Sequence, residues 1–222
     1  MKVTHRPAAR IALAIAVLAP AVAATVAAAS AGASQGRNTS HAAAAGLRAE
    51  PAASTATAAG TRLWVALYRG SNGASEATSI ATSSHRSEVF VTGLSGDTSG
   101  HQAYGTVAYS ARGVRRWAAS YNGPAGENFA NELAVSPDGS KVFVTGASAG
   151  KPIGNVSQYE YATVAYDSST GASRWVRRFT LLSTSGASAT AVAVSPGGSK
   201  VFVTGNAANA AGLFYATVAY RA

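Results

Sequence analysis

One short line of sequence is written three times in this chain of 222 residues. It reads SPDGSKVFVTG at residues 136–146 and SPGGSKVFVTG at residues 195–205, and these two copies differ only where Asp138 is replaced by Gly197. A diverged copy, SSHRSEVFVTG, occupies residues 83–93. A line that returns at regular intervals predicts that the chain builds the same structural unit several times.

Two further markers return at the same interval. The runs YGTVAY and YATVAY begin at Tyr104, Tyr161 and Tyr215, and a tryptophan stands at Trp64, Trp117 and Trp175. Independent markers that share a period of roughly 55 residues indicate a repeat architecture. The period predicts three repeats, at about residues 62–117, 118–175 and 176–222.

The pattern within one period is typical of β-structure. In the middle repeat, the apolar runs LAVS, KVFVTG, YATVAY and SRWVRRF alternate with short turns that contain Pro, Asp and Gly. Proline presets φ for the first turn position, and glycine accepts a positive φ where the turn requires it. The sequence therefore predicts four antiparallel strands in each repeat.

These predicted strands are apolar on both faces. In YATVAY, Tyr161 and Thr163 point to one side of the sheet while Ala162 and Val164 point to the other, and neither side is polar. A sheet that buries both faces needs a neighbour on each side. We therefore expect an all-β fold of β-propeller-type blades of four antiparallel strands, with about three blades in a partial or open propeller.

The strand count leaves the two ends of this array unmatched. Residues 62–68, RLWVALY, are predicted to be a fourth strand without a blade, and the last repeat ends in YATVAY without a fourth strand. Closed propellers have about 4–8 blades, so three alone leave apolar faces and an unpaired edge. We expect self-association through these edges, with residues 62–68 of one copy pairing with residues 214–220 of another in a six-bladed homodimer. The alternatives are an open or truncated arc and a strained closed ring of three blades.

The run AYDSSTGASRW, at residues 165–175, resembles the A-x-D-x-x-T-G-x-x-x-W signature of quinoprotein-type, or PQQ-like, β-propeller repeats at every fixed position. AYSARGVRRW, at residues 108–117, keeps the Ala, Gly and Trp but has Ser110 in place of the Asp and is one residue shorter. The repeated hairpin line is also similar to that of other propeller families, including lactonase-like ones. The resemblance covers residues 62–222 and implies the fold, whereas the activity has to be argued from a site.

The N-terminal region has the pattern of a secretory signal peptide over residues 1–33. A basic start precedes a long, alanine-rich apolar run, and AGA at residues 31–33 fits a cleavage site. We expect a secreted, extracellular protein; the alternative is an uncleaved segment that keeps the chain at the cell envelope, and this segment is the one membrane contact expected. Residues 34–60 contain too few large apolar residues to fold and are predicted to be a disordered linker.

One motif suggests catalysis. GASAG, at residues 146–150, matches the nucleophile elbow G-x-S-x-G, but that motif needs a helix after it, and the KPIGN that follows does not start one. We interpret it as a loop and do not expect Ser148 to be a nucleophile. The sequence predicts no catalytic residue, no cofactor-binding residue and no cofactor.

Metal ligands are also sparse. Cysteine is absent, and the spacing of His85 and His101 matches no metal pattern. Asp97 and His101 form at most a pair within one loop, while Asp138 and Asp167 are interpreted as turn residues. The sequence therefore predicts no metal site.

The chain carries 18 Lys and Arg against 9 Asp and Glu, a net charge of +9. Nucleic-acid binders gather such charge on one face beside a known motif, so we expect no nucleic-acid partner. Small groups of arginine fall on predicted fourth strands, at Arg115, Arg116, Arg177 and Arg178. We interpret them as a solvated rim that discourages edge pairing; the alternative is an anion-binding rim for a cell-surface polymer.

Together with the predicted export, these features favour a non-enzymatic binding or scaffold module outside the cell, with a cell-surface polymer or protein as partner. The alternatives are a fragment or relative of a propeller enzyme, of the quinoprotein or lactonase-like hydrolase kind, and a truncated gene product. An enzyme of that kind needs acids and bases that converge from several blades, and no such set is evident in the sequence.

Overall fold

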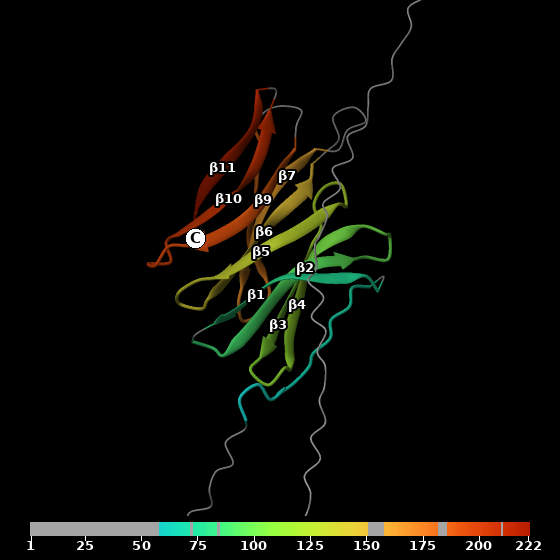
Figure 1. The fold of residues 1–222 in the computed structure, drawn as a ribbon, viewed down its shortest axis with the longest axis vertical. Helices are drawn as coiled ribbons and strands as arrows, with labels where there is room; N and C mark the ends of the chain where they lie inside the picture. Colours follow the sequence, from blue (N-terminus) through green and yellow to red (C-terminus); the bar gives the residue numbers. More distant parts are fainter. Residues whose placement is uncertain (1–57, 72, 84, 151–157, 182–185, 210) are drawn as a thin grey trace, which may run out of the picture. The chain divides into compact units, whose positions relative to one another are not determined.

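The computed structural model describes residues 58–71, 73–83, 85–150, 158–181, 186–209 and 211–222. The predicted signal peptide, and the predicted linker as far as residue 57, lie outside these ranges. Within them the chain forms eleven strands and no helix (Figure 1). The expected all-β fold is therefore confirmed.

The strands form three antiparallel sheets, and each sheet keeps the order of the chain. The first contains β1 (Ser75–Ser83), β2 (Glu88–Gly96), β3 (Gln102–Ser110) and β4 (Arg115–Tyr121). The second contains β5 (Asn128–Val135), β6 (Lys141–Ala149), β7 (Tyr159–Asp167) and β8 (Ser173–Phe179). The third contains β9 (Ala187–Val194), β10 (Lys200–Asn209) and β11 (Gly212–Arg221). The expected division into four, four and three strands is confirmed.

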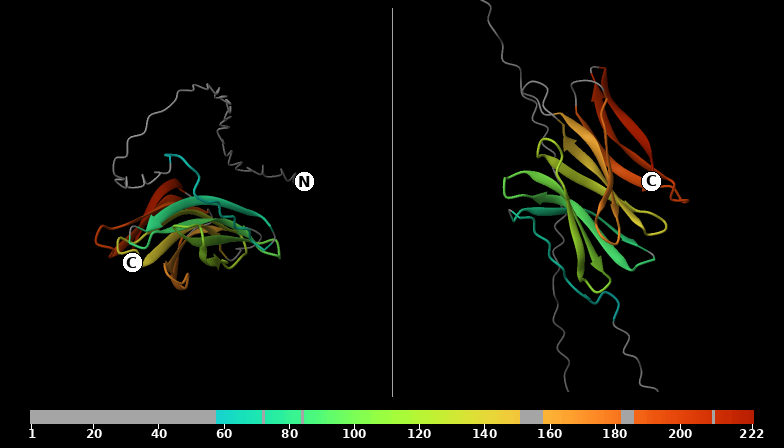
Figure 2. Two further views of the ribbon diagram at one scale, coloured as in Figure 1. Left: turned by 90° about the horizontal axis from the view of Figure 1, so that it is seen from below. Right: turned by 180° about the vertical axis from the view of Figure 1, so that it is seen from behind.

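Two hydrophobic cores lie on opposite faces of the second sheet. One is shared with the first sheet and includes Phe90, Trp117, Val144, Val164 and Tyr166. The other is shared with the third sheet and includes Phe143, Tyr161, Ala165, Val201 and Val203. The prediction that YATVAY of the middle repeat is buried on both faces is therefore confirmed, because the second sheet lies between its two neighbours. Figure 2 shows this succession of sheets from two further sides.

The glycine that ends VFVTG is required by a β-bulge in the first strand of each sheet. In β5 the register with β6 shifts between Ala130 and Glu132, and a Cβ on Gly146 would lie only 2.0 Å from the carbonyl oxygen of Phe129. Gly93 and Gly205 stand in the same position, with the carbonyl oxygens of Glu76 and Ser188 at 1.9 and 2.2 Å from such a Cβ. The bulged backbone occupies the space that any side chain would need.

The threonine of the same line also has a fixed partner. Its hydroxyl lies 3.1 Å from that of Thr163 in the second sheet, where Thr145 and Thr163 face each other across β6 and β7. The pairs Thr92 with Thr106 and Thr204 with Thr217 repeat this contact at 3.0 Å. Cross-strand hydroxyl pairs of this kind stabilise a sheet, which explains why VFVTG and YATVAY recur together.

The two aspartates interpreted as turn residues hold turns, as expected. Asp138 accepts hydrogen bonds from Ser136 and Ser140, and these bonds hold the pKa of its carboxyl well below the usual range. Asp167 accepts from Ser169 and from the guanidinium of Arg174, which lower its pKa in the same way. Both carboxylates are thus occupied within the β5–β6 and β7–β8 turns.

The prediction of a strand at residues 62–68 is wrong for the isolated chain, because the segment belongs to no sheet. It lies instead against the outer face of the first sheet. The indole of Trp64 packs on the ring of Tyr109, with 6.3 Å between centroids, and its Nε1 donates to the carbonyl oxygen of Ala111. A strand needs a partner strand, and the segment pairs with neither edge strand of the first sheet, β1 or β4.

The interpretation of residues 146–150 as a loop is also wrong. The first four of them continue β6, whose pairing with β7 runs on to Ala149 opposite Tyr159. The threonine–glycine end of the repeated line therefore lies inside the strand and not at its end. β2 and β10 likewise continue past the line, to Gly96 and Asn209.

Candidate functional site

A half-buried arginine organises the polar side chains between the first and second sheets. Arg178, near the end of β8, donates through Nε to Glu160 at 2.7 Å and through Nη1 to the hydroxyls of Tyr121 and Ser148, both at 2.7 Å. Its Nη2 donates to the carbonyl oxygens of Ser148 and Ala149. Burial opposes the charge of Arg178, but the bonds to Glu160 and Tyr121 outweigh it and raise the pKa of the guanidinium.

Ser148 is held inside this cluster, and among the described residues its hydroxyl is hydrogen-bonded to no base, since Glu160 on the opposite strand is bonded to Arg178. Its hydroxyl donates to Oδ1 of Asn128 at 2.5 Å and accepts from Arg178. Asn128 is itself fixed, since it accepts from the backbone of Gly123 and donates to the carbonyl of Gln102. A nucleophilic serine needs a neighbouring group that takes its proton, and an amide oxygen and a guanidinium do not provide one.

The cluster is extended by an exposed pair. The hydroxyl of Tyr159 donates to Glu127 at 2.6 Å, and burial together with this carboxylate raises the pKa of Tyr159 to about 12. Tyr159 begins β7, and Glu127 immediately precedes β5. This pair therefore ties two strand ends of the second sheet together, while the bond from Arg178 to Tyr121 joins the second sheet to the first, and both are structural tasks.

Replacement of Arg178 by alanine is expected to lower the free energy of unfolding by about 2–3 kcal/mol, because it removes charged hydrogen bonds and leaves Glu160 without its cation. Arg178→Lys should recover only part of this loss, since an ammonium group lacks the fork that reaches several acceptors. Urea denaturation followed by circular dichroism measures both. Arg177→Ala, on the exposed side of the same strand, should change the value by no more than about 0.5 kcal/mol. Equal losses for Arg177→Ala and Arg178→Ala would contradict the structural role.

The four arginines of the predicted rim are not all exposed in the structure. Arg115, Arg116 and Arg177 are exposed on β4 and β8, whereas Arg178 makes the internal bonds described above. Arg116 also lines a cavity of about 350 Å³ together with Arg86, Arg112 and Glu88. Sequence reasoning missed Arg86 and Arg112, which join the group because the β1–β2 and β3–β4 turns lie at the same end of the sheet. Anion binding at this rim stays a prediction.

His85 and His101 lie where the sequence placed them. His85 stands in the β1–β2 turn, and Nδ1 of His101 lies 3.5 Å from the carboxylate of Asp97 in the β2–β3 loop. Among the described residues, no group of three or more His, Cys, Asp or Glu side chains is arranged to hold a metal ion.

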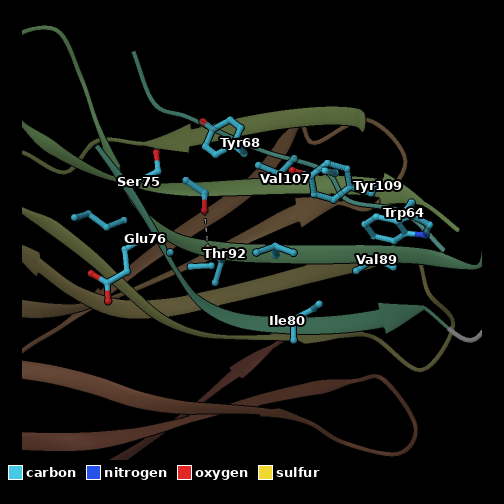
Figure 3. A pocket seen from close by; sticks show the side chains of 15 residues that line it. Trp64, Tyr68, Ser75, Glu76, Ile80, Val89, Thr92, Val107 and Tyr109 are labelled. Atoms are coloured by element: carbon cyan, nitrogen blue, oxygen red, sulfur yellow. Dashed lines mark hydrogen bonds between the residues drawn. The ribbon is translucent and has the colours of Figure 1, made fainter. Parts of the chain in front are cut away.

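An apolar cavity of about 340 Å³ lies on the outer face of the first sheet, beside residues 62–68. Figure 3 shows Trp64 and Tyr109 at one end of it, Tyr68 on the side of the segment, and Ile80, Val89 and Val107 on the sheet. We call this surface the leading face and define it by Ile80, Val89, Val91, Val107 and Tyr109. In the second sheet, the residues at the same repeat positions as Val89, Val91, Val107 and Tyr109 are Val142, Val144, Val164 and Tyr166, and all four are buried against the first sheet.

On the leading face residues 62–68 leave Val107 and Tyr109 only 3% and 6% exposed, whereas the outer face of the third sheet is open. Phe202 is 40% exposed and Tyr215 is 92% exposed, whereas their counterparts Phe143 and Tyr161 are fully buried. We call this surface the trailing face and define it by Phe202, Thr204, Tyr215, Thr217 and Ala219, which the register places on one side of β10 and β11. Large apolar patches of this kind mark sites of association. Sequence reasoning anticipated exposed faces but could not locate these residues on them.

No protein-family model and no curated protein matches this chain. Within the described ranges, no helix is long and apolar enough to cross a membrane. The three repeats nevertheless serve as references for one another, since each contact between the first and second sheets can be compared with the corresponding contact between the second and third.

Proposed function

We propose that this chain is an exported, non-enzymatic scaffold module of propeller-type blades, and that it acts by binding another polypeptide through its leading and trailing faces. The observation that carries the proposal is the contrast in burial between repeats. Residues that are buried between sheets inside the chain recur on the trailing face with 40% and 92% exposure, at Phe202 and Tyr215. Export is proposed from the signal pattern of residues 1–33.

Several contacts favour binding over catalysis. The polar residues nearest to a catalytic arrangement, Ser148, Asn128 and Arg178, all make structural hydrogen bonds. The trailing face, by contrast, is covered by no other described part of the chain, and the leading face is covered only in part, by residues 62–68. Burial of apolar surface is worth about 25 cal/mol for each Å², so an interface between two such faces would provide a strong driving force for association.

Light scattering after size-exclusion chromatography tests the proposal on protein that begins at residue 34, at micromolar concentration. A mass above that of one chain is expected, and Tyr215→Asp should reduce it because a buried aspartate on an apolar face is costly. Gly197→Asp is the matched control: it adds the same charge to the same sheet, and it restores the SPDG turn of the middle repeat. A monodisperse, folded monomer for the unaltered protein would contradict the proposed function.

A further inference from the structure

This inference rests on the proposed function and names the partner. We infer that the polypeptide bound by both end faces is a second copy of this chain, and that residues 62–68 of each copy form the fourth strand of the other copy's third sheet. Three kinds of contact between sheets carry the argument. Each contact is formed twice inside the chain, between the first and second sheets and between the second and third. At the two ends of the chain, one side of the same contact is present and the other side is missing.

The first contact is a row of three aromatic rings that joins consecutive sheets. Trp117 stacks between Phe90 of its own sheet and Tyr166 of the next, with ring centroids 5.9 and 6.3 Å apart. The next row, with centroids at 5.8 and 5.9 Å, consists of Phe143, Trp175 and Tyr220.

The third row is divided between the two ends of the chain. Trp64 already stacks on Tyr109, with centroids 6.3 Å apart, but the phenylalanine position of the row is unfilled. Phe202 is the remaining phenylalanine of the repeat and stands exposed on the trailing face. A second copy that places its Phe202 against Trp64 completes the row.

The second contact is a tyrosine hydroxyl bound to a carbonyl of the next sheet. Tyr104 donates to Ala162 at 3.4 Å, and Tyr161 donates to Ala216 at 3.1 Å. Tyr215 is the third tyrosine of this kind, and it is 92% exposed. The carbonyl at the matching position of the first sheet belongs to Gly105, on the leading face. In the assembly, Tyr215 of one copy donates to Gly105 of the other.

The third contact comes from the bulged residue of each first strand. Thr78 donates to the carbonyl of Ala130 at 2.9 Å, and Asn131 donates to that of Ala189 at 2.6 Å. Thr190 holds the same position in β9 and is exposed. Its partner by this pattern is the carbonyl of Ala77 in a second copy.

The internal pairings fix the register of the exchanged strand. Trp117 lies opposite Ala108, and Tyr121 lies opposite Tyr104. In the second sheet, Trp175 lies opposite Ala165 and Phe179 lies opposite Tyr161 in the same way. Transferred to the third sheet, the pattern places Trp64 opposite Ala219 and Tyr68 opposite Tyr215 of the other copy.

The position of residues 62–68 suits this exchange without rearrangement. The Nε1 of Trp64 donates to the carbonyl of Ala111, as that of Trp117 donates to Ser168 in the next sheet. The opposite side of the segment carries Leu63, Val65 and Leu67, whose exposures are 78%, 66% and 90%. A segment that is apolar on both sides is typical of a strand buried on both faces. Beside β11 of a second copy, this side would face that copy's second sheet, as Val176, the counterpart of Val65, faces the first sheet.

The partner copy is a better occupant than the chain itself. The second sheet lies between the first and the third and packs on both, so the leading and trailing faces point away from each other within one chain. Two copies related by a two-fold axis make two equal junctions, which close the assembly and pair the free edge of β11 in each third sheet. The closed assembly has six sheets, within the range of about 4–8 that propellers use.

Engineered disulfides test the register, because the chain has no cysteine of its own. The pairings of Thr106 with Ala119 and of Thr163 with Arg177 place Ala66 opposite Thr217 of the other copy. The double variant Ala66→Cys/Thr217→Cys should therefore form a covalent dimer under mild oxidation, seen on a non-reducing gel. Val65→Cys/Thr217→Cys is the control, since its two side chains would point to opposite faces of the sheet and could not be bridged.

The outcomes separate this inference from the proposed function. A covalent dimer from the first variant but not from the control supports the two-fold exchange. A disulfide closed within one chain, shown by a monomer band with no free thiol, overturns it in favour of a ring of three sheets. If light scattering shows that the protein associates but Ala66→Cys/Thr217→Cys forms no disulfide, the exchange is wrong and the scaffold function still stands. Circular dichroism establishes that each variant is folded, and both replaced positions lie outside the two hydrophobic cores of the chain.

Discussion

Gly146→Ala is expected to destabilise the chain by about 4 kcal/mol or more, which is a large part of the roughly 5–15 kcal/mol that stabilises a typical domain. The added Cβ would lie 2.0 Å from the carbonyl oxygen of Phe129 and 3.0 Å from Asn131 N and Ala130 Cα. These are backbone atoms that the β5–β6 pairing holds in place. No change of side-chain rotamer can relieve the overlap, so the bulge itself would have to rearrange.

The matched control is Gly197→Ala, which lies in the same repeated line in the third sheet. A Cβ at Gly197 would meet no atom within 4 Å. This variant should be neutral, or more stable by about 0.4–1 kcal/mol because alanine restricts the unfolded chain. The yield of soluble protein and the urea midpoint measure both variants. Equal midpoints for Gly146→Ala and the unaltered chain would show that the bulge does not require glycine.

The repeated line predicted the strands correctly because its residues contact residues that are close in sequence or directly opposite in the sheet. The turn of SPDG, the paired threonines and the two-sided apolar pattern each depend on residues close in sequence or at a fixed register, and the strands they predict are present. Ser173–Phe179, for example, is β8 with the boundaries expected from SRWVRRF. The sequence shows that the glycine of VFVTG is the same in all three copies, but it does not show why. The glycine is required by a bulge in the paired strand, more than ten residues away in the chain.

The errors arose where a residue's partner is set by packing over long distances. Residues 62–68 have the composition of a strand, but a strand exists only where it pairs with another, and in the isolated chain this segment pairs with none of the described strands. Arg178 was grouped with the exposed rim because it lies, beside Arg177, on a predicted fourth strand. Its hydroxyl partner Tyr121 is 57 residues earlier in the chain, and nothing in the local sequence indicates that contact.

Charge patterning failed for the same reason. A pair such as Arg177 and Arg178 on one strand must point to opposite faces, so one arginine reaches solvent while the other enters the junction between sheets. Alternation predicts only that the two face opposite ways and not that one is buried, since the neighbours Arg115 and Arg116 are both exposed. Which of them is buried depends on Glu160 and Ser148, which the fold brings beside β8.

Trp117→Ala is expected to lower the free energy of unfolding by about 3–5 kcal/mol, the range found for removal of a large buried aromatic side chain. The indole is 9% exposed and contacts the rings of Phe90 and Tyr166. Its Nε1 donates to the buried carbonyl of Ser168 at 2.7 Å. Gly171 lies directly against it, since a Cβ there would be 2.6 Å from the indole. Alanine would therefore leave a cavity in the core and an unsatisfied carbonyl.

Two further variants separate these causes. Trp117→Phe keeps most of the ring contact and loses the donor, so its cost should be about 1–3 kcal/mol, the penalty for a buried acceptor left unpaired. Trp64→Ala removes the tryptophan one period before Trp117, which is 36% exposed and stacks on no other described ring than Tyr109. In dilute solution, where copies are separate, Trp64→Ala should cost clearly less than Trp117→Ala. Urea titration followed by circular dichroism at low and high protein concentration measures this. A completed aromatic row would bury Trp64, so the free-energy loss caused by Trp64→Ala should rise with protein concentration, while the loss caused by Trp117→Ala stays constant. If the loss caused by Trp64→Ala is the same at every concentration, Trp64 has no partner in a second copy.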